Sequence, residues 1–568
     1  MGVFKLAEMV SRIYANFRGV DFRGAEVNLV RSPDSLNVWK DYKEIDSIRT
    51  RPEMALKNSF NAPVYGVFFY KANNTEMMLV HSGTTLYKVV NGIKTVLYTG
   101  LNRARSNSFV YDNVWYFKDG LHYLQYDGTT IKDVEGYIPT TSIGRKPGGG
   151  GTAYEDVNML SSYRINTFLA DGVGKEFYLD TQNIDSDFYP EIFVNDLHDG
   201  LFDASWEVDF ASGKITFFDA PPAPSTDGRD NVVIKFKKTV AGHRDRINKC
   251  TLLQVFDNRV FFSGNKDYPN VIFHCSLNDP TYCSDLDYYN EGLDSAEVKG
   301  LVAGNNVLWV FKEPSQENTT VFYHNPTIDS EYGKIYPSTH SSIATGCVGK
   351  AINFNDDIVF FSDRGMEAIN GDVTTEQVIA HRSTLIDRKL LTETDYKNMI
   401  LEEWEGYLMI FIGDKVYLAD SRGKFANGNH LEYEFFYWEM KKRITCAKVH
   451  KGILYLGTED GVYTLTDTKS NVESYWTTPI DKFENPHYQK TSNKRGCVIE
   501  ATGDVTVSAK TDKTGWEEIG TYENITDYFT SRIKRKKFKD IQLKFSSETR
   551  FSLETATLEC FIGGYIKR

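Results

Sequence analysis

Residues 64–90 read VYGVFFYKANNTEMMLVHSGTTLYKVV. Three short apolar runs are separated by two polar pairs, Asn73-Asn74 and Ser82-Gly83. Asn, Asp and Gly tolerate the positive φ angles that two-residue hairpin turns require, so this stretch predicts three antiparallel strands joined by tight turns. Such a meander cannot bury both of its faces alone and therefore needs similar units beside it.

The same order of strand, polar pair and strand returns along the chain. Turn-forming residues precede further apolar runs at Asp112-Asn113, Asn355-Asp356-Asp357, Glu405-Gly406 and Lys451-Gly452, and less regular copies surround residues 252–262 and 301–311. Repetition at roughly 40–50 residues is typical of propeller blades, and about six to eight blades fit this length. The alternative is a string of unrelated β-sandwiches, because the copies diverge and no W-D or kelch motif marks them.

Two regions break the repeat. Residues 144–151 read GRKPGGGG, which is typical of a flexible linker between domains, and strand-like segments with a proline cluster follow it up to about residue 245. Beyond residue 474 the alternation continues without the blade spacing. We therefore predict an all-β fold, an irregular β-propeller with an inserted β-sandwich and a C-terminal β-sandwich. The predicted parts are an N-terminal segment with the first blades (1–145), the inserted sandwich (146–248), the remaining blades (249–470) and the terminal sandwich (471–568).

The composition favours β-strands and argues against a protein that binds nucleic acid through its phosphates. The 568 residues are enough for two to four domains, and 14% of them are aromatic, which favours half-buried sheets. The net charge of −12 is opposite to that of a protein that neutralises phosphates. An acidic wall would instead let DNA slide through a channel.

The cysteines and the hydropathy suggest assembly in a cytosol. Seven cysteines, an odd number, lie without C-x-x-C spacing and form no cluster with histidines, so we expect reduced thiols and no zinc site. No apolar run reaches the ~18 residues of a membrane span, and Lys5 and Glu8 interrupt the start of the chain, which is unlike a signal peptide.

Three short motifs resemble catalytic or ligand sites, and each has a plainer reading. His243-Arg244-Asp245 has the letters of a kinase catalytic loop but none of its accompanying motifs. Glycines 148–151 lack the ending of a phosphate loop, which favours a hinge. A calcium loop from Asp285, Asp287, Asn290 and Glu291 would match no EF-hand spacing. We expect no catalytic residue, metal or cofactor, because no Ser, His and Asp are brought together by the sequence.

The densest basic run is the remaining candidate site. It consists of Lys534, Arg535, Lys536, Lys537 and Lys539. These side chains could face phosphates in a DNA channel or contact a neighbouring subunit. The favoured alternative is an exposed edge strand whose lysines prevent edge-to-edge aggregation.

Several segments of the chain resemble the packaged-DNA stabilisation or tail nozzle proteins of short-tailed bacteriophages, a β-propeller family. The opening segments are 16-NFRGVDFRG-24, 31-RSPDSLNV-38 and 50-TRP-52, the middle ones are 256-FDNRVFFSGN-265, 267-DYPN-270 and 277-LNDPTY-282, and the ending ones are 475-YWTTP-479, 494-KRGC-497 and 563-GGYIKR-568. The inserted region, with 212-SGKITF-217 and 220-APP-222, is similar to small sandwiches found on phage tail proteins. The resemblance covers most of the chain, and its motifs are turn and packing motifs.

This resemblance implies a structural virion protein and no enzyme. It implies a homo-oligomeric ring, a hexamer, below the portal and adaptor, which extends the DNA channel and retains the packaged genome until ejection. The implied partners are the portal, the adaptor, other tail proteins, tail fibres through the inserted domain, and double-stranded DNA passing without sequence specificity. The implied location is the virion tail, after assembly in the host cytoplasm. The alternative is a carbohydrate-binding or carbohydrate-cleaving propeller, such as a receptor-binding tail spike, whose aromatic side chains would stack on sugars.

Overall fold

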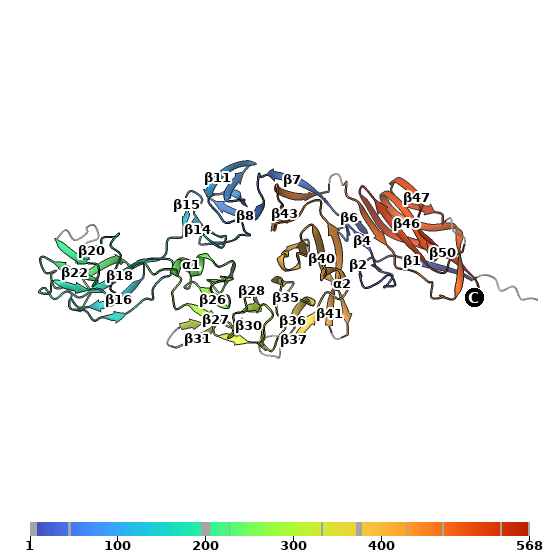
Figure 1. Cartoon of the computed structure of the whole chain (residues 1–568). Coiled ribbons are helices and arrows are strands. Elements are labelled where there is room, and N and C mark those ends of the chain that lie inside the picture. The colour runs from blue at the N-terminus through green and yellow to red at the C-terminus, as the bar shows by residue number, and fades with distance from the viewer. Residues whose placement is uncertain are drawn as a thin grey trace, which may run out of the picture. The chain divides into compact units, whose positions relative to one another are not determined.

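A computed structural model of the chain describes residues 8–43, 47–194, 205–226, 228–317, 319–330, 333–370, 378–428, 430–467, 471–533 and 537–565 (Figure 1). The chain forms two compact units. The first comprises residues 1–69, 77–96 and 341–568, and the second comprises residues 70–76 and 97–340.

The described residues form seven four-stranded antiparallel sheets, which are the blades of an irregular β-propeller. This number lies within the predicted range. In chain order they are blade 1, β8–β11 (Val64–Ala72, Thr75–Ser82, Thr85–Val90, Ile93–Thr99); blade 2, β12–β15 (Asn107–Tyr111, Val114–Lys118, Tyr123–Tyr126, Ile131–Asp133); blade 3, β24–β27 (Leu252–Phe256, Arg259–Ser263, Val271–His274, Tyr288–Asn290); blade 4, β28, β29, β30 and β33 (Val298–Gly304, Val307–Lys312, Val321–His324, Ser338–His340); blade 5, β34–β37 (Ala351–Phe354, Asp357–Ser362, Gly365–Asn370, Val378–His381); blade 6, β38–β41 (Ile400–Trp404, Tyr407–Ile412, Lys415–Asn427, His430–Glu439); and blade 7, β42–β44 with β7 (Cys446–His450, Ile453–Gly457, Gly461–Thr466, Glu53–Ser59).

A tight turn joins the first strand to the second in every blade. The two residues between the first and second strand have positive φ in all seven sheets: Asn73-Asn74, Asp112-Asn113, Asp257-Asn258, Asn305-Asn306, Asn355-Asp356, Glu405-Gly406 and Lys451-Gly452. Two successive positive φ angles define the turn whose twist matches that of the flanking strands, and Asn, Asp and Gly adopt them at least cost. The polar pairs of the sequence therefore set the register of every blade.

Aromatic side chains fill the interior of the blades and of the terminal sandwich. Trp115, Trp309, Trp438 and Trp476 are all completely buried. Phe109 of β12 stacks on Tyr116 of β13 with ring centroids 4.9 Å apart, in the core that blades 2 and 3 share. The aromatic composition is thus explained mainly by core packing.

The inserted sandwich lies between blades 2 and 3 in sequence and has two sheets. The larger consists of β17, β16, β18, β23 and β20 (Thr152–Ala153, Thr140–Arg145, Tyr163–Phe168, Val232–Lys237, Glu191–Val194), and the smaller of β19, β22 and β21 (Glu176–Tyr178, Lys214–Phe217, Trp206–Asp209). Burial alternates strictly along β18 and β23, and their inward residues pack against Phe177 and Ile215 of the smaller sheet. Strict alternation of this kind is what a two-layer sandwich requires.

The terminal sandwich contains strands from both ends of the chain. Its ten-stranded sheet includes β45–β50 (Ser474–Thr477, Tyr488–Thr511, Thr514–Ile525, Tyr528–Ser531, Ile541–Ser547, Phe551–Tyr565). It also includes β1, β4, β5 and β6 (Glu8–Tyr14, Ser35–Leu36, Val38–Trp39, Ile48–Thr50). The strand β1 pairs along its whole length with β50 (Figure 1). Sequence analysis did not anticipate this exchange.

The remaining elements are short. They are β2 (Gly19–Val20) paired in parallel with β3 (Arg31–Ser32), the hairpin β31–β32 (Thr327–Asp329, Gly333–Ile335), the helices α1 (His243–Asn248) and α2 (Asp387–Leu390), and a 3-10 turn at Tyr396–Asn398. Within the described residues, neither helix approaches the length or apolar character that crossing a membrane requires.

Candidate functional site

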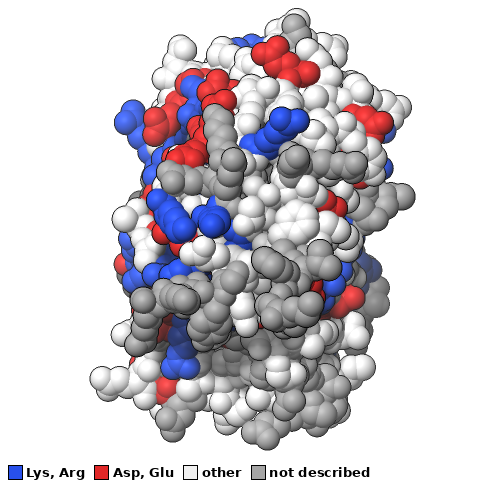
Figure 2. All heavy atoms as spheres, turned by 90° about the vertical axis from the view of Figure 1, so that its right-hand side faces the viewer, with Lys and Arg blue, Asp and Glu red and all other residues white. Residues whose placement is uncertain are grey.

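The basic run is only partly described. Lys534, Arg535 and Lys536 lie outside the described residues. Lys537 is exposed, and the Lys539 backbone N–H donates to Asp512 at 2.8 Å, next to the turn between β46 and β47. On the face that Figure 2 shows, Lys and Arg side chains lie interspersed with Asp and Glu.

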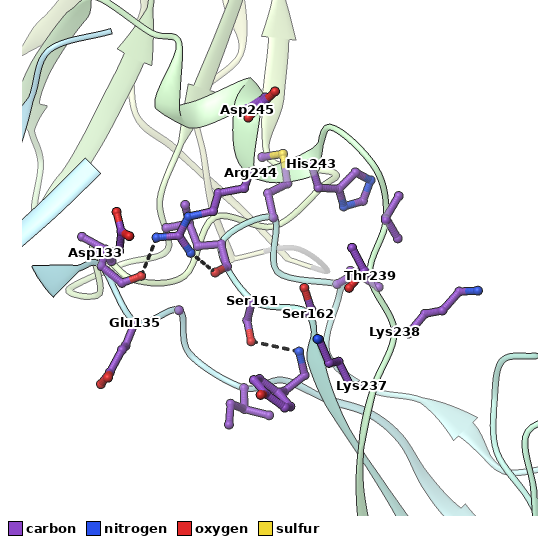
Figure 3. Close-up of a pocket in the computed structure, with 18 of the residues that line it drawn as sticks. Asp133, Glu135, Ser161, Ser162, Lys237, Lys238, Thr239, His243, Arg244 and Asp245 are labelled. Carbon is purple, nitrogen blue, oxygen red and sulfur yellow. Dashed lines mark hydrogen bonds between the residues drawn. The ribbon is translucent and has the colours of Figure 1, made fainter. Parts of the chain in front are cut away.

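The motif His243-Arg244-Asp245 forms the start of α1, where its arginine has a structural role. The Arg244 guanidinium donates to the carbonyl oxygens of Leu160 at 2.7 Å and Val134 at 2.8 Å (Figure 3). It thereby joins the last strand of blade 2 to the entrance of the inserted sandwich. Burial, followed by the positive charge of Arg246, lowers the pKa of His243.

The glycine-rich segment corrects one prediction. Residues 144–151 form a hairpin inside the sandwich, because β16 pairs with β17 and Lys146 bridges to Gly149. The prediction of a linker or hinge was therefore wrong. Glycine supplies positive φ in a tight turn as readily as freedom in a linker, so composition alone could not separate the two. A strand follows the glycines, whereas a phosphate loop is followed by a helix.

Among the four residues considered for calcium, Glu291 has partners of its own. Glu291 is fully buried and contacts His324 at 2.9 Å and Ser338 at 2.6 Å. Burial raises the pKa of Asp287 to about 6, although the charge of Arg259 opposes this. In the part of the chain that the structure describes, no three His, Cys, Asp or Glu side chains are grouped to hold a metal ion.

The seven cysteines are all buried, and no disulfide is formed among the described residues. Burial raises the pKa of Cys250 and Cys275 to about 12, so these two thiols stay protonated and are poor nucleophiles.

One group contains the residue types of a hydrolase triad without its geometry. His381 lies between Asp387, at 2.7 Å from Nε2, and Glu367, at 3.1 Å from Nδ1. Ser383 donates to Asp387 at 2.5 Å rather than to the histidine. A nucleophile needs its hydroxyl beside a neutral imidazole, and this imidazole is held as a cation by two carboxylates.

The opening and ending segments of the family resemblance meet at one junction. The strand β4 pairs with β45, which places Ser35 opposite Trp476, and Phe17 packs edge-on against Trp476 with ring centroids 5.1 Å apart. The Ser32 hydroxyl donates to the Thr477 carbonyl at 2.7 Å.

Two arginines of the opening segments fix this junction to blade 6. Arg31 makes a bidentate pair with the buried Glu434 at 2.7 and 2.8 Å. Arg51 donates to Asn37 and to the carbonyl oxygens of Pro52 and Glu439 at 2.7–2.8 Å. Burial lowers the pKa of Arg51 to about 10, so it remains charged at neutral pH.

The middle segment of the resemblance holds the inserted sandwich. Asn158, only 1% exposed, donates to the carbonyl oxygens of Tyr137 and Thr281, both at 2.9 Å, and accepts from the backbone N–H of Leu160 and Cys283, both at 3.0 Å. All four hydrogen-bonding positions of the amide are thus filled. The sandwich entrance is attached at this point to the loop that follows β26.

A cavity of about 880 Å³ lies near the base of the sandwich (Figure 3). Its apolar lining comes from Val134, Ile138, Val157, Met159, Leu160 and Val240. The charged side chains around it are Lys132, Lys237, Lys238 and Arg244 with Asp133, Glu135 and Asp245. No sequence pattern predicted this cavity, because its walls come from segments about 100 residues apart.

Comparison with known proteins adds little. No family model matches the sequence, and no curated protein matches it. Among solved structures, the chain is similar to BamB from Moraxella catarrhalis at 12% identity, over 72% of this chain and 97% of that one, with a TM-score of 0.33. It is also similar to BBS1N in complex with ARL6DN (9% identity, 74% and 98% coverage, TM-score 0.26) and to an exo-beta-1,3-galactanase from Phanerochaete chrysosporium (8%, 54% and 94%, 0.23). Likeness at this level supports no conclusion about function.

Proposed function

We propose that this protein is a non-catalytic structural subunit of the tail of a short-tailed bacteriophage. In this proposal it forms a homo-oligomeric ring, a hexamer by family resemblance, below the portal and adaptor. The ring acts as a nozzle that extends the DNA channel and retains the packaged DNA until ejection.

The observation that carries the proposal is the position of the resembling segments. The opening and ending segments, which are more than 400 residues apart, meet where β4 pairs with β45, and the middle segment anchors the inserted sandwich. Segments that were selected by resemblance alone therefore build the junctions of one architecture. The buried arginines of the opening segments, and Asn158 at the sandwich entrance, hold backbone and carboxylate groups in place, which suits a structural shell better than a reaction centre.

The charge of the chain suits a DNA channel. A net charge of −12 disfavours adhesion of duplex DNA, so the genome could move through a lumen without being gripped. The run from Lys534 to Lys539 remains the candidate for local phosphate contact or for contact with a neighbouring subunit. Under this proposal the protein works in the virion tail after assembly in the host cytoplasm, with the portal, the adaptor and tail fibres as partners.

The carbohydrate alternative would depend on the exposed aromatic rings, such as Tyr154 and Trp516, and not on the tryptophans that fill the cores. Trp115, Trp309, Trp438 and Trp476 are buried in cores, whereas a sugar-binding face needs such rings at the surface. We do not propose this function.

The test is the mass of the purified protein by native mass spectrometry and light scattering, with and without a portal–adaptor complex. The proposal expects a closed oligomer, either alone or on the complex. A protein that stays monomeric and does not bind the complex would contradict it, and binding in a glycan screen would then favour the alternative.

A further inference from the structure

Leu293 is an unusual surface residue. Its side chain is 100% exposed, in the loop that follows β27 at the outer edge of blade 3. A leucine entirely in water forgoes the stabilisation that burial would give it. Single exposed apolar residues are normal on protein surfaces, so Leu293 is informative only together with the other features of its loop.

The loop is held firmly on both sides of Leu293. The backbone N–H groups of Leu293 and Asp294 donate to the Glu317 carboxylate at 2.5 and 2.9 Å. The Lys312 ammonium, which is fully buried, donates to the Glu291 carbonyl at 2.8 Å and to Asp294 at 2.6 Å. These hydrogen bonds hold the loop in place, so the Leu293 side chain projects from a fixed backbone.

The surroundings of Leu293 carry excess negative charge. Asp294 and Glu317 share the single ammonium of Lys312. Glu297 and Glu313 share that of Lys299. Two of the four carboxylates are therefore uncompensated within this group.

The cavity at the base of the inserted sandwich is complementary to this loop. Its floor is apolar, and four Lys and Arg side chains line it against three carboxylates. Two of these cations meet carbonyl oxygens rather than acids: Lys238 donates to Asn183 at 2.6 Å, and Arg244 donates to Leu160 and Val134. The volume of about 880 Å³ exceeds that of a leucine side chain and leaves room for the loop that carries it.

We propose that Leu293 of one copy of the chain inserts into this cavity of a second copy. Apolar surface then meets an apolar floor, and the acidic loop meets the more basic lining. The two surfaces are different parts of the molecule, so the contact is head-to-tail and generates a ring or a filament rather than a two-fold dimer. This inference rests on the proposed oligomeric function and names the surfaces that would build it.

The first test compares oligomer mass for the wild-type protein, Leu293→Asp and the control Ile328→Asp, alone and on the portal–adaptor complex. Ile328 is 84% exposed in the hairpin β31–β32 and lies outside the proposed interface. We expect Leu293→Asp to lose the oligomer and Ile328→Asp to retain it.

A second test uses cross-linking. All seven native cysteines are buried, so a bismaleimide would react with an introduced surface cysteine first. When a tagged Leu293→Cys variant is mixed with a differently tagged Val240→Cys variant, we expect a cross-link between the two copies. A mixture of two differently tagged wild-type proteins, whose cysteines are all buried, should give no cross-link. This interface would be overturned if the wild-type protein and Leu293→Asp both form the oligomer and no cross-link appears. The proposed ring itself would then still stand. A wild-type protein that never oligomerises would overturn both proposals.

Discussion

At the scale of single residues, the buried charges of this protein stabilise structure rather than perform chemistry. His381 is the clearest example. Burial alone would lower its pKa, but hydrogen bonds to Asp387 and Glu367, together with their charges, raise it to about 10. The imidazole is therefore a cation at neutral pH that holds two strands and α2 together. Residue types alone could not show this, since the sequence does not say which atoms a histidine meets.

The raised pKa predicts a pH-dependent contribution to stability. A group whose pKa rises on folding stabilises the fold below its unfolded value of about 6.5, and this contribution is lost as the pH rises towards 10. We expect His381→Gln to cost roughly 2 kcal/mol of unfolding free energy at pH 6. Denaturant titrations from pH 6 to 10 would measure the difference from wild type, which should shrink across this range. A difference that stays constant with pH would contradict the assignment.

At the scale of elements, the blade turns were predictable and the hairpin at residues 144–151 was not. Asn73-Asn74 and Asp112-Asn113 have the positive φ angles that their residue types favour. The prediction for residues 144–151 was wrong because glycine and proline are common in hairpins and in linkers alike. The fourth strand of blade 7 was also missed, since β7 lies more than 400 residues before its partner β44 and no local pattern links them.

Two blades have a less favourable first turn residue. Lys451 has a φ of 50°, a conformation that Asn adopts at lower cost than a lysine. We expect Lys451→Asn to raise the unfolding free energy by about 0.5 kcal/mol and the melting temperature accordingly. Calorimetry would measure this change. The variant Asn306→Val is the opposite case, because it places a β-branched residue at a φ of 62° and should lower the unfolding free energy by about 1–2 kcal/mol. Equal melting temperatures for all three proteins would show that these turns do not limit stability.

At the scale of the whole molecule, the N-terminal strands belong to the C-terminal sandwich. The all-β class, the propeller and both sandwiches followed from alternation and turn spacing. The exchange of β1, β4 and β6 did not, because β4 is only two residues long and its partner β45 is distant in sequence. Long-range pairing of such short strands depends on tertiary context that local patterns do not carry.

This exchange predicts that the terminal sandwich cannot fold alone. A fragment of residues 471–568 lacks β1, β4, β5 and β6 and leaves β50 unpaired on one side. We expect it to aggregate or to give a poorly dispersed NMR spectrum, because an uncovered hydrophobic strand edge invites further pairing. Supplying residues 8–50 in trans should restore dispersion. A folded, monomeric 471–568 fragment would refute the prediction.

Because β4 pairs with β45, it must wait during synthesis until its partner strand has been made. At about 5–20 residues per second, the ribosome adds Trp476 roughly 20 to 90 seconds after Leu36. During that interval the first strands have left the ribosome while their partners do not yet exist. Several nascent chains on one messenger RNA carry the same unpaired N-terminal strands at the same time. The cell must therefore keep these early segments from one another until the last hundred residues arrive, and slow translation would lengthen the exposure.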